Sequence, residues 1–341
     1  MNWSNSYTSY WRIYKVNRST WADGQQINNI DSVSIARTVD GNLLESGSFE
    51  ATGDVDTGYY RIVMTAEQGG DVERVDVATL LLDVKSGQND YGTTVHTLEG
   101  YSVLYPASVK SVVTGAYAPA GSNGAQYAAT LLGSAINAPI QVEGGFVLND
   151  HIVHDVGSSV IDAVWAVLDA GGFVMQIDGR GVVHIMPKPA TPSLIIDSTN
   201  ATLLTNGINF VNDISAIPNK YIVIQGNVIT AIENSDSQSE VSTTSRGYSI
   251  DLVDESPTPV NGETIGAYAE RRLHEESYMK DERKYTREYY PNVYLYSIVT
   301  ASITGLTGDL RVVSQTVNCG NGITIDETAV REVNLWQTST T

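Results

Sequence analysis

Short alternating runs of hydrophobic and polar residues dominate the first third of the chain. Alternation with a period of two places successive side chains on opposite faces of a β-strand. Asp-Gly, Gly-Gly and Ser-Gly pairs, which favour tight turns, separate the runs. The runs between residues 11 and 105 read WRIYKV, SVSIARTV, GSFEATG, YYRIVMTAE, ERVDVATLLLDV and TTVHTLEGYSVLY. This pattern predicts a β-barrel or β-sandwich domain over residues 1–105, in which the segment RVDVATLLLDV is covered on both faces.

Helical spacing replaces the alternation in the next part of the chain. Small and hydrophobic residues recur every three or four positions over residues 124–136 and again over residues 160–168. Ser158 or Ser159 is a suitable N-cap for the second helix, and Gly171-Gly172 is suited to end it. We therefore predict a mixed α/β insertion over residues 106–190.

The Gly-rich stretch Asp178-Gly179-Arg180-Gly181 is the first candidate for chemistry. The strand-like runs FVMQI and VVHIM flank it, and this context predicts a tight β-hairpin turn. A phosphate-binding loop is the alternative, but a dinucleotide fingerprint opens a helix, and His184 replaces its third glycine. A calcium loop would need alternating Asp or Asn ligands and a closing Glu, which are missing. The hairpin is the favoured interpretation.

The segment Asp150-His151-Ile152-Val153-His154-Asp155 is a second candidate. Two histidines three residues apart would share one side of a helical turn and could hold one metal ion. The alternative is a polar linker to the next helix, whose dipole Asp155 would complement. Because no third strong ligand lies nearby in the sequence, we predict no metal site and no cofactor.

Strand-like segments return after a proline-bearing connector that follows Pro187. We predict a second β domain over residues 191–305, which includes a charged helix at 264–280. Residues 306–341 are predicted to be C-terminal strands that pack back on the rest of the protein. The polar stretch from Glu233 to Arg246 is predicted to be an exposed loop.

The predicted helix carries opposite charges at helical spacing. Arg271, Arg272, Glu275 and Glu276 lie within little more than one turn, where ion pairs can form. They form either a solvated face with weak surface pairs or a subunit interface, in which opposite charges set the register. These four residues are the candidate interface residues.

Composition narrows the class of function. The chain has 341 residues, 42% of them hydrophobic, and a formal net charge of -19. Such an acidic chain is poorly suited to binding phosphate backbones. The sequence shows neither a run of about 18 apolar residues nor a signal peptide, so we expect no membrane span and no export by a signal. The single cysteine, Cys319, excludes an intrachain disulfide and a Cys-based zinc site.

The sequence also lacks a recognisable catalytic signature. The segment Gly100-Tyr101-Ser102-Val103-Leu104 fails at the last position of a nucleophile elbow, and Cys319 has no cysteine-protease context. A catalytic pair of carboxylates remains an open alternative, because only the separation of the two groups in space identifies a glycoside hydrolase. We therefore expect no enzyme, and a carbohydrate-binding or glycoside-hydrolysing β-rich protein is the alternative.

The order of these segments resembles the baseplate or tail-tip hub of bacteriophage tails, including the N-terminal hub region of Tal-like tail-associated proteins. The resemblance spans about Trp11 to Ile325 and is carried by SSVIDAVWAVLDAGGFVMQIDGRGVVHIMPKP, NDISAIPNKYIVI, STTSRG and SPTPVNGETIGAYAERRLHEES. It implies an α+β, β-rich fold with two tail-tube-like β-barrel domains and smaller mixed α/β insertions. Longer members carry peptidase, lysozyme-like or fibrous extensions that this chain lacks, so those activities are expected of partner proteins.

The resemblance also implies an assembly. Three copies would form a homotrimeric ring with a pseudo-sixfold lumen, which joins a sixfold tail tube or distal tail ring to a threefold tip. The other expected neighbours are the C-terminus of the tape-measure protein and spike or fibre proteins. The protein would be made in the host cytoplasm and would reside in the virion. DNA would pass through the lumen without specific binding, because acidic walls repel its phosphates.

Overall fold

The chain divides into two compact units. The computed structural model describes residues 1–90, 93–113, 117–212, 214–255, 257, 259 and 263–335. Unit 1 consists of Met1–Ile208 and Lys284–Ala329, and unit 2 consists of Asn209–Arg283 and Val330–Thr341. These boundaries differ from those of the four predicted segments, and the assignment of those segments as domains stays a prediction.

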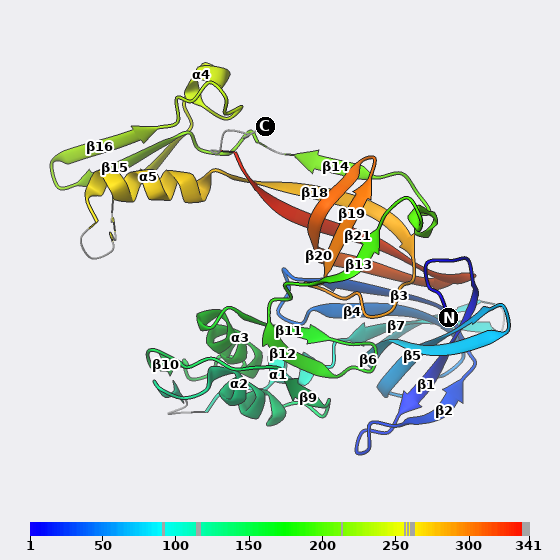
Figure 1. The fold of residues 1–341 in the computed structure, drawn as a ribbon. Coiled ribbons are helices and arrows are strands. Elements are labelled where there is room, and N and C mark those ends of the chain that lie inside the picture. The colour runs from blue at the N-terminus through cyan, green and yellow to red at the C-terminus, as the bar shows by residue number, and fades with distance from the viewer. Residues whose placement is uncertain are drawn as a thin grey trace. The chain divides into compact units, whose positions relative to one another are not determined.

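A large sheet, most of whose strand pairs are antiparallel, forms the body of unit 1 (Figure 1). Its strands follow the order β18-β21-β20-β3-β4-β7-β6-β5-β1-β2, and β19 and β13 branch from β20. β18 and β21 each continue into unit 2. The bounds are β1 Thr8–Val16, β2 Asp23–Ile27, β3 Ile30–Thr38, β4 Glu45–Thr52, β5 Gly58–Gln68, β6 Asp71–Asp90, β7 Thr93–Tyr101, β13 Pro192–Ile196, β18 Tyr278–Glu288, β19 Ile298–Ile303, β20 Leu306–Gly320 and β21 Gly322–Asn334.

The predicted β-rich fold is confirmed. None of the sheets in the described part of the chain closes into a barrel, so the two predicted tail-tube-like barrels are not confirmed. The strand path is instead open, and it ends at β2 on one side.

The alternation in the sequence decides which side chains the sheet buries. In β3, Val33, Ile35 and Arg37 are buried and the residues between them are exposed. In β6, four consecutive residues from Val77 to Leu80 have no exposed surface, which confirms that this segment is covered on both faces. One of the covers is the turn between β11 and β12, because the Thr79 hydroxyl donates to the Gly179 carbonyl at 3.0 Å.

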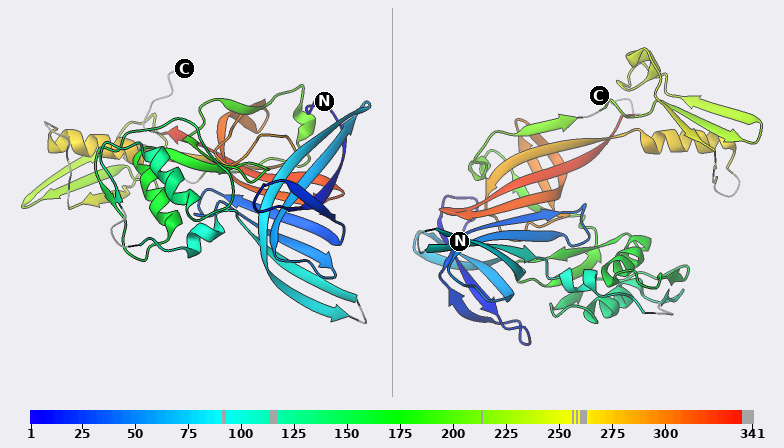
Figure 2. Two further views of the ribbon diagram at one scale, coloured as in Figure 1. Left: turned by 90° about the horizontal axis from the view of Figure 1, so that it is seen from below. Right: turned by 180° about the vertical axis from the view of Figure 1, so that it is seen from behind.

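Between β7 and β13, the described residues of unit 1 contain three helices and small sheets. β11 and β12 form the predicted hairpin, and β9 pairs with β12. α2 and α3 pack side by side and contribute buried side chains to the apolar core of this region (Figure 2). The bounds are α1 Tyr105–Val109, β8 Tyr117–Ala118, α2 Gly124–Gly133, β9 Ile140–Val142, β10 Ile152–Val153, α3 Val160–Ala170, β11 Phe173–Ile177 and β12 Val183–Pro187. The short 3-10 helix η1, Ala201–Leu203, follows β13.

The start and end of α3 confirm the predicted capping. The Ser159 hydroxyl accepts a hydrogen bond from the Asp162 backbone N–H, as an N-cap does. Gly171 follows the last helical residue, and Gly172 adopts a φ of 66°, which glycine tolerates best.

Unit 2 is built around a three-stranded sheet with one helix against it (Figure 1). β15 lies in the centre, antiparallel to β16 and parallel to β17. α5 packs Tyr268, Ala269 and Leu273 against Tyr221 and Val223 of β15. The bounds are β14 Asn209–Asn212, β15 Lys220–Gln225, β16 Val228–Glu233, α4 Thr243–Arg246, β17 Asp251–Asp254 and α5 Ile265–Glu276.

Two predictions about unit 2 need correction. The helix predicted over residues 264–280 ends at Glu276, because β18 begins at Tyr278 and continues with an alternating burial pattern. The polar stretch from Glu233 to Arg246 is not a simple exposed loop. It contains α4 and four buried side chains, which are Asn234, Ser239, Val241 and Ser242.

Candidate interaction surfaces

The turn Asp178-Gly179-Arg180-Gly181 contributes backbone carbonyls to the large sheet. The Arg180 carbonyl accepts hydrogen bonds from Trp21 Nε1 at 2.7 Å and Arg61 Nη2 at 3.0 Å. The Asp178 carboxylate accepts the Val182 N–H at 2.9 Å and so closes the turn. A phosphate cradle presents N–H donors, whereas this turn directs carbonyl acceptors at protein side chains. The hairpin interpretation is confirmed.

Arg61 is a second side chain that binds this turn. Its side chain is fully buried on β5, and its guanidinium also donates to Asp23 at 2.5 Å and to Thr79 at 3.1 Å. A buried guanidinium needs acceptors in several directions, and the turn supplies one of them. The β11–β12 hairpin is therefore part of the interior of unit 1.

The two histidines of the candidate metal segment do not share one face. They flank β10, whose extended backbone does not stack residues three apart as a helical turn does. His151 Nδ1 accepts the Ala120 N–H at 3.2 Å, and His154 packs its ring against Tyr127. Burial lowers the pKa of His154. Among the described residues, no three His, Cys, Asp or Glu side chains are placed to hold a metal ion.

His184 has a different role, which the sequence did not indicate. Its Nδ1 lies 2.7 Å from Glu143 and its Nε2 lies 3.3 Å from Asp178. The hydrogen bond to Asp178 raises the pKa of His184, burial opposes this effect, and Glu143 adds to the rise. Glu143 is 41 residues away in the sequence, so no local pattern could have revealed the contact.

The four candidate interface residues are brought together on α5. Arg271 lies 2.9 Å from Glu275 and contacts Glu263 at 2.9 Å. Arg272 lies 2.7 Å from Glu275 and 3.0 Å from Glu276. Hydrogen bonds from Arg271 and Arg272 lower the pKa of Glu275. The charges therefore pair along the helix, and they leave a partly exposed, balanced surface.

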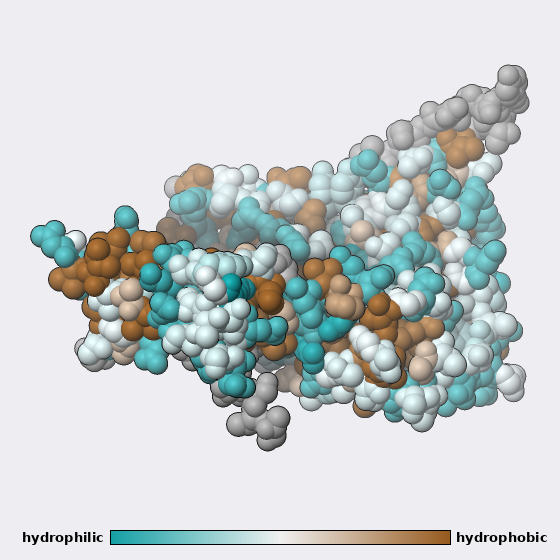
Figure 3. Space-filling view, turned by 90° about the horizontal axis from the view of Figure 1, so that it is seen from above, coloured by the Kyte–Doolittle hydropathy of each residue, from teal (hydrophilic) through white to brown (hydrophobic). Residues whose placement is uncertain are grey.

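The opposite face of the small sheet in unit 2 is apolar and open, and we call it the open face. Pleating directs Tyr221 and Val223 toward α5, so Ile222 and Ile224 point the other way. By register, Ile229 and Val253 share that direction, and they are 68% and 51% exposed. Figure 3 shows apolar side chains gathered at the left, over β15 and β16. Exposed apolar patches of this kind mark contact surfaces.

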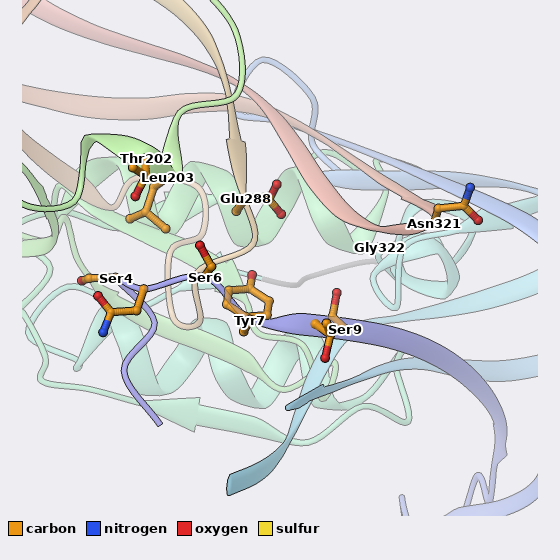
Figure 4. Close-up of a pocket in the computed structure, with 11 residues that line it drawn as sticks. Ser4, Ser6, Tyr7, Ser9, Thr202, Leu203, Glu288, Asn321 and Gly322 are labelled. Atoms are coloured by element: carbon orange, nitrogen blue, oxygen red, sulfur yellow. The ribbon is translucent and has the colours of Figure 1, made fainter. Parts of the chain in front are cut away.

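A polar pocket of about 460 Å³ lies in unit 1 (Figure 4). Its walls come from the N-terminal segment that enters β1, from η1, from the end of β18 and from the β20–β21 turn. The side chains are mostly hydroxyls and amides, and Glu288 is the one carboxylate among them. The lining residues are Ser4, Asn5, Ser6, Tyr7, Thr8, Ser9, Thr202, Leu203, Glu288, Asn321 and Gly322.

A second pocket of unit 1, of about 610 Å³, brings carboxylates and aromatic rings together. Trp3, Tyr290 and Tyr294 line it together with Asp76 and Asp178. Each of these carboxylates already has a cationic neighbour, since Asp76 lies 3.6 Å from Arg180 and Asp178 lies 3.3 Å from His184. Burial raises the pKa of Asp76. Glu73 is a third carboxylate in the lining, so the pocket holds one further acid besides the ion-paired Asp76 and Asp178.

None of the helices in the described part of the chain is long and apolar enough to span a membrane.

Comparisons with known proteins relate the fold to phage tails. No family model and no curated protein sequence matches the chain. The 43 kDa tail protein of prophage MuSo2 from Shewanella oneidensis aligns with a TM-score of 0.63 and 13% identity, over 95% of this chain and 98% of that chain. The tail protein from Neisseria meningitidis MC58 aligns with a TM-score of 0.62 and 11% identity, over 95% and 97%.

A third match comes from a Francisella complex. A chain of the Francisella PdpA–VgrG complex aligns with a TM-score of 0.55 and 7% identity, over 95% of this chain and 53% of that chain. At these identities the likeness is one of fold. The chain has the fold of phage tail proteins, which confirms the resemblance indicated by the order of its segments.

Proposed function

We propose that this protein is a structural component of a phage tail tip or baseplate, in which it acts as the hub. The observation that carries the proposal is the end-to-end alignment with two tail proteins, which covers 98% and 97% of their lengths. Because the alignments cover nearly all of both chains, the whole arrangement of segments is similar to that of the tail proteins. A match over one module would show similarity for that module alone. The charged face of α5 and the open face of the unit 2 sheet supply surfaces for protein contacts.

In this proposal three copies form a ring around a pseudo-sixfold lumen, and each copy contributes two tail-tube-like domains. The ring joins a distal tail protein or tail-tube ring to a threefold tip, and it adjoins the tape-measure C-terminus and spike or fibre proteins. DNA passes through the lumen without specific binding. The protein is made in the host cytoplasm and resides in the virion.

The mass of the particle in solution tests this function. Light scattering on the purified chain, alone and mixed with its tail-tube or distal tail protein, should give three times 36.8 kDa for the hub in at least one condition. A monomer in both conditions would contradict the ring. Negative-stain images of the trimer should show a central opening.

The pairs on α5 are the proposed subunit contact. Because Arg271 and Arg272 already have carboxylate partners on α5 and at Glu263 just before it, they would set the orientation of a neighbour more than its affinity. Arg272→Glu should reduce the trimer fraction, whereas Arg18→Glu, the same charge change at an exposed residue of unit 1, should leave it unchanged. Equal effects of the two variants would remove α5 from the interface.

Carbohydrate binding is the second candidate function, and the aromatic pocket around Trp3 and Tyr294 is the observation that favours it. A stable monomer that retains an oligosaccharide, and that loses it in the Tyr294→Ala variant, would support this alternative. The hub proposal predicts no such retention.

A further inference from the structure

The polar pocket of unit 1 contains a carboxylate that no cation of the described residues neutralises. The Glu288 side chain is partly buried, and no hydrogen bond or ion pair reaches its carboxylate from the described residues. Burial raises the pKa of Glu288, and no basic side chain opposes that effect. The other buried acids of the same sheets differ, because Arg287 lies 2.7 Å from Glu327 and Arg37 lies 3.4 Å from Glu45.

Strand geometry explains why Glu288 is separated from its basic neighbour. Successive residues of β18 point to opposite faces, so the Arg287 side chain enters the core while Glu288 faces the pocket. Figure 4 shows Glu288 above the N-terminal segment that carries Ser6 and Tyr7, with Thr202 and Leu203 to one side. The carboxylate is therefore held at a cavity wall by a rigid strand.

The remaining walls of the pocket supply acceptors. The hydroxyls of Ser4, Ser6, Ser9 and Thr202 make no hydrogen bond within the described residues. A hydroxyl can accept two hydrogen bonds, and a carboxylate accepts several. The Tyr7 hydroxyl is already engaged, since it donates to the Tyr289 carbonyl at 2.6 Å.

This chemistry selects the charge and the shape of a ligand. An anion would be repelled by Glu288, and a dehydrated divalent metal usually needs more than one carboxylate or comparable anionic ligand. A primary ammonium presents three N–H donors and one positive charge, which match one carboxylate with hydroxyl neighbours. The volume of about 460 Å³ also accommodates an alkyl stem beside Leu203 and the Tyr7 ring.

We propose that this pocket binds a primary alkylammonium group, with Glu288 as its counter-ion. Such a group is the end of a lysine side chain and also the end of a free polyamine. The site does not depend on the hub function, because the argument for it uses only pocket side chains, all of which belong to unit 1.

Titration of Glu288 tests the site directly. We would follow its carboxyl carbon by NMR, assigned by loss of the signal in Glu288→Gln, with and without n-butylammonium at constant ionic strength. Saturable binding that lowers the pKa of Glu288 is expected, because an adjacent cation favours the ionised form. Tetramethylammonium, which has the charge but no N–H donor, should not produce this shift.

Variants and probes separate the outcomes. Affinity for n-butylammonium should fall at least about tenfold in Glu288→Gln, since a hydrogen bond to a charged group is lost. It should be unchanged in Asp71→Asn, which removes the same charge from an exposed residue at the start of β6. N-acetyl-lysinamide binding as tightly as n-butylammonium would identify a lysine side chain as the ligand, and preference for spermidine would identify a polyamine.

Several results would overturn the proposal. They are equal shifts with tetramethylammonium, no saturable shift with any amine, and a shift produced only by Ca²⁺. If Glu288→Gln does not fold, Ser6→Ala and Glu288→Asp provide the comparison, and unchanged affinity in both would also overturn it.

Discussion

The carboxylate of Glu327 lies at the centre of a buried polar network in unit 1. It accepts hydrogen bonds from the Tyr285 hydroxyl at 2.6 Å, from Arg287 Nη2 at 2.7 Å and from Gln315 Nε2 at 2.7 Å. Burial alone would raise the pKa of Glu327, but Arg287 and these hydrogen bonds outweigh it, so the pKa is lowered. The fold therefore stabilises the ionised form.

Glu327→Gln should lower the free energy of unfolding at pH 7 by about 3–5 kcal/mol, because Arg287 would stay buried without a counter-charge. A carboxyl whose pKa is lowered by folding contributes stability above its unfolded pKa and loses it as the pH falls. Urea unfolding should therefore show the difference between wild type and variant shrinking below pH 4.5. A difference that is constant down to low pH would contradict this account.

Glu45 is the opposite case. Its Oε1 atom is buried without a hydrogen-bond partner in the described residues, and its Oε2 atom lies 3.4 Å from Arg37 Nε. Burial raises the pKa of Glu45 to about 7, even though Arg37 opposes the rise. The fold therefore favours the protonated form of this side chain.

Glu45→Gln should remove a pH dependence from the stability of unit 1. Ionising Glu45 opposes folding, so the wild type should lose stability relative to the variant as the pH rises from 4.5 to about 7. Over this range, the free energy of unfolding of the wild type should fall relative to that of the variant by on the order of 3 kcal/mol. Urea unfolding at both ends of this range measures it, and parallel behaviour of the two proteins would refute the assignment.

Residue-scale features of this kind were the least predictable from the sequence. Arg37, Arg61 and Arg287 occupy strands where a charged side chain would normally face solvent, yet all three are buried. Their partners lie far along the chain, since Gln315 is 278 residues from Arg37 and Arg180 is 119 residues from Arg61. A pattern read within one strand carries no information about such partners.

At the scale of elements, the β11–β12 turn packs directly against the backbone of β6. A Cβ atom built on Gly179 would lie 1.8 Å from the Asp76 carbonyl oxygen, a backbone atom that cannot rotate away. Gly179→Ala should therefore displace the turn and lower the free energy of unfolding by about 3 kcal/mol or more. Gly207→Ala, where no atom lies within 4 Å, is the control and should change stability by less than about 0.5 kcal/mol. Similar midpoints in a thermal melt of the two variants would show that the turn can relax.

His184 connects the same hairpin to the segment that follows β9. The pKa of His184 is raised in the folded state. Its contribution to folding stability is therefore fully present below the unfolded pKa of 6.5, and it is lost as the pH rises through the folded pKa. His184→Gln should therefore cost more stability at pH 5.5 than at pH 9. Denaturant unfolding at the two pH values measures the difference. A larger loss of unfolding free energy at pH 9 than at pH 5.5 would contradict this prediction.

Elements with strong local signals were predicted well from the sequence. α3 has its cap at Ser159 and its end at Gly171, and the hairpin after it lies where the Asp-Gly turn placed it. The predicted end of α5 was wrong. The segment YMKDERKYTRE contains charges that suit a helix, but its residues alternate between buried and exposed because they form β18. The small polar residues between Glu233 and Arg246 suggested an exposed loop, and several of them are instead used as buried hydrogen-bond partners.

At the scale of the whole molecule, charge gives the clearest expectation. With a formal net charge of -19, the chain should not retain double-stranded DNA at about 0.15 M salt, because few cations are available to displace counterions. An electrophoretic mobility shift assay with a random-sequence duplex should show no complex. A complex whose affinity falls steeply with salt would contradict the proposed passage of DNA without binding.

The broad architecture was also accessible from the sequence, but the connectivity of the sheet was not. Strands lie on both sides of the stretch that contains α1, α2 and α3, and the division of the chain into the four predicted segments stays a prediction. The sequence had no means to show that β3 pairs with β20, in register from Val33 with Cys319 to Thr38 with Ser314. Pairing between distant strands depends on side-chain packing and burial in the folded protein, and the local sequence of each strand does not indicate its partner.

The bond from Arg61 to the Arg180 carbonyl has a consequence for the order in which the protein can fold during synthesis. A ribosome releases the residues of β1 to β7 well before it releases the β11–β12 turn. Until that turn emerges, the Arg61 guanidinium and the Thr79 hydroxyl lack acceptors that they use in the finished molecule. The nascent N-terminal strands should thus stay susceptible to proteolysis until about 180 residues have left the exit tunnel, after which the hairpin completes their interior.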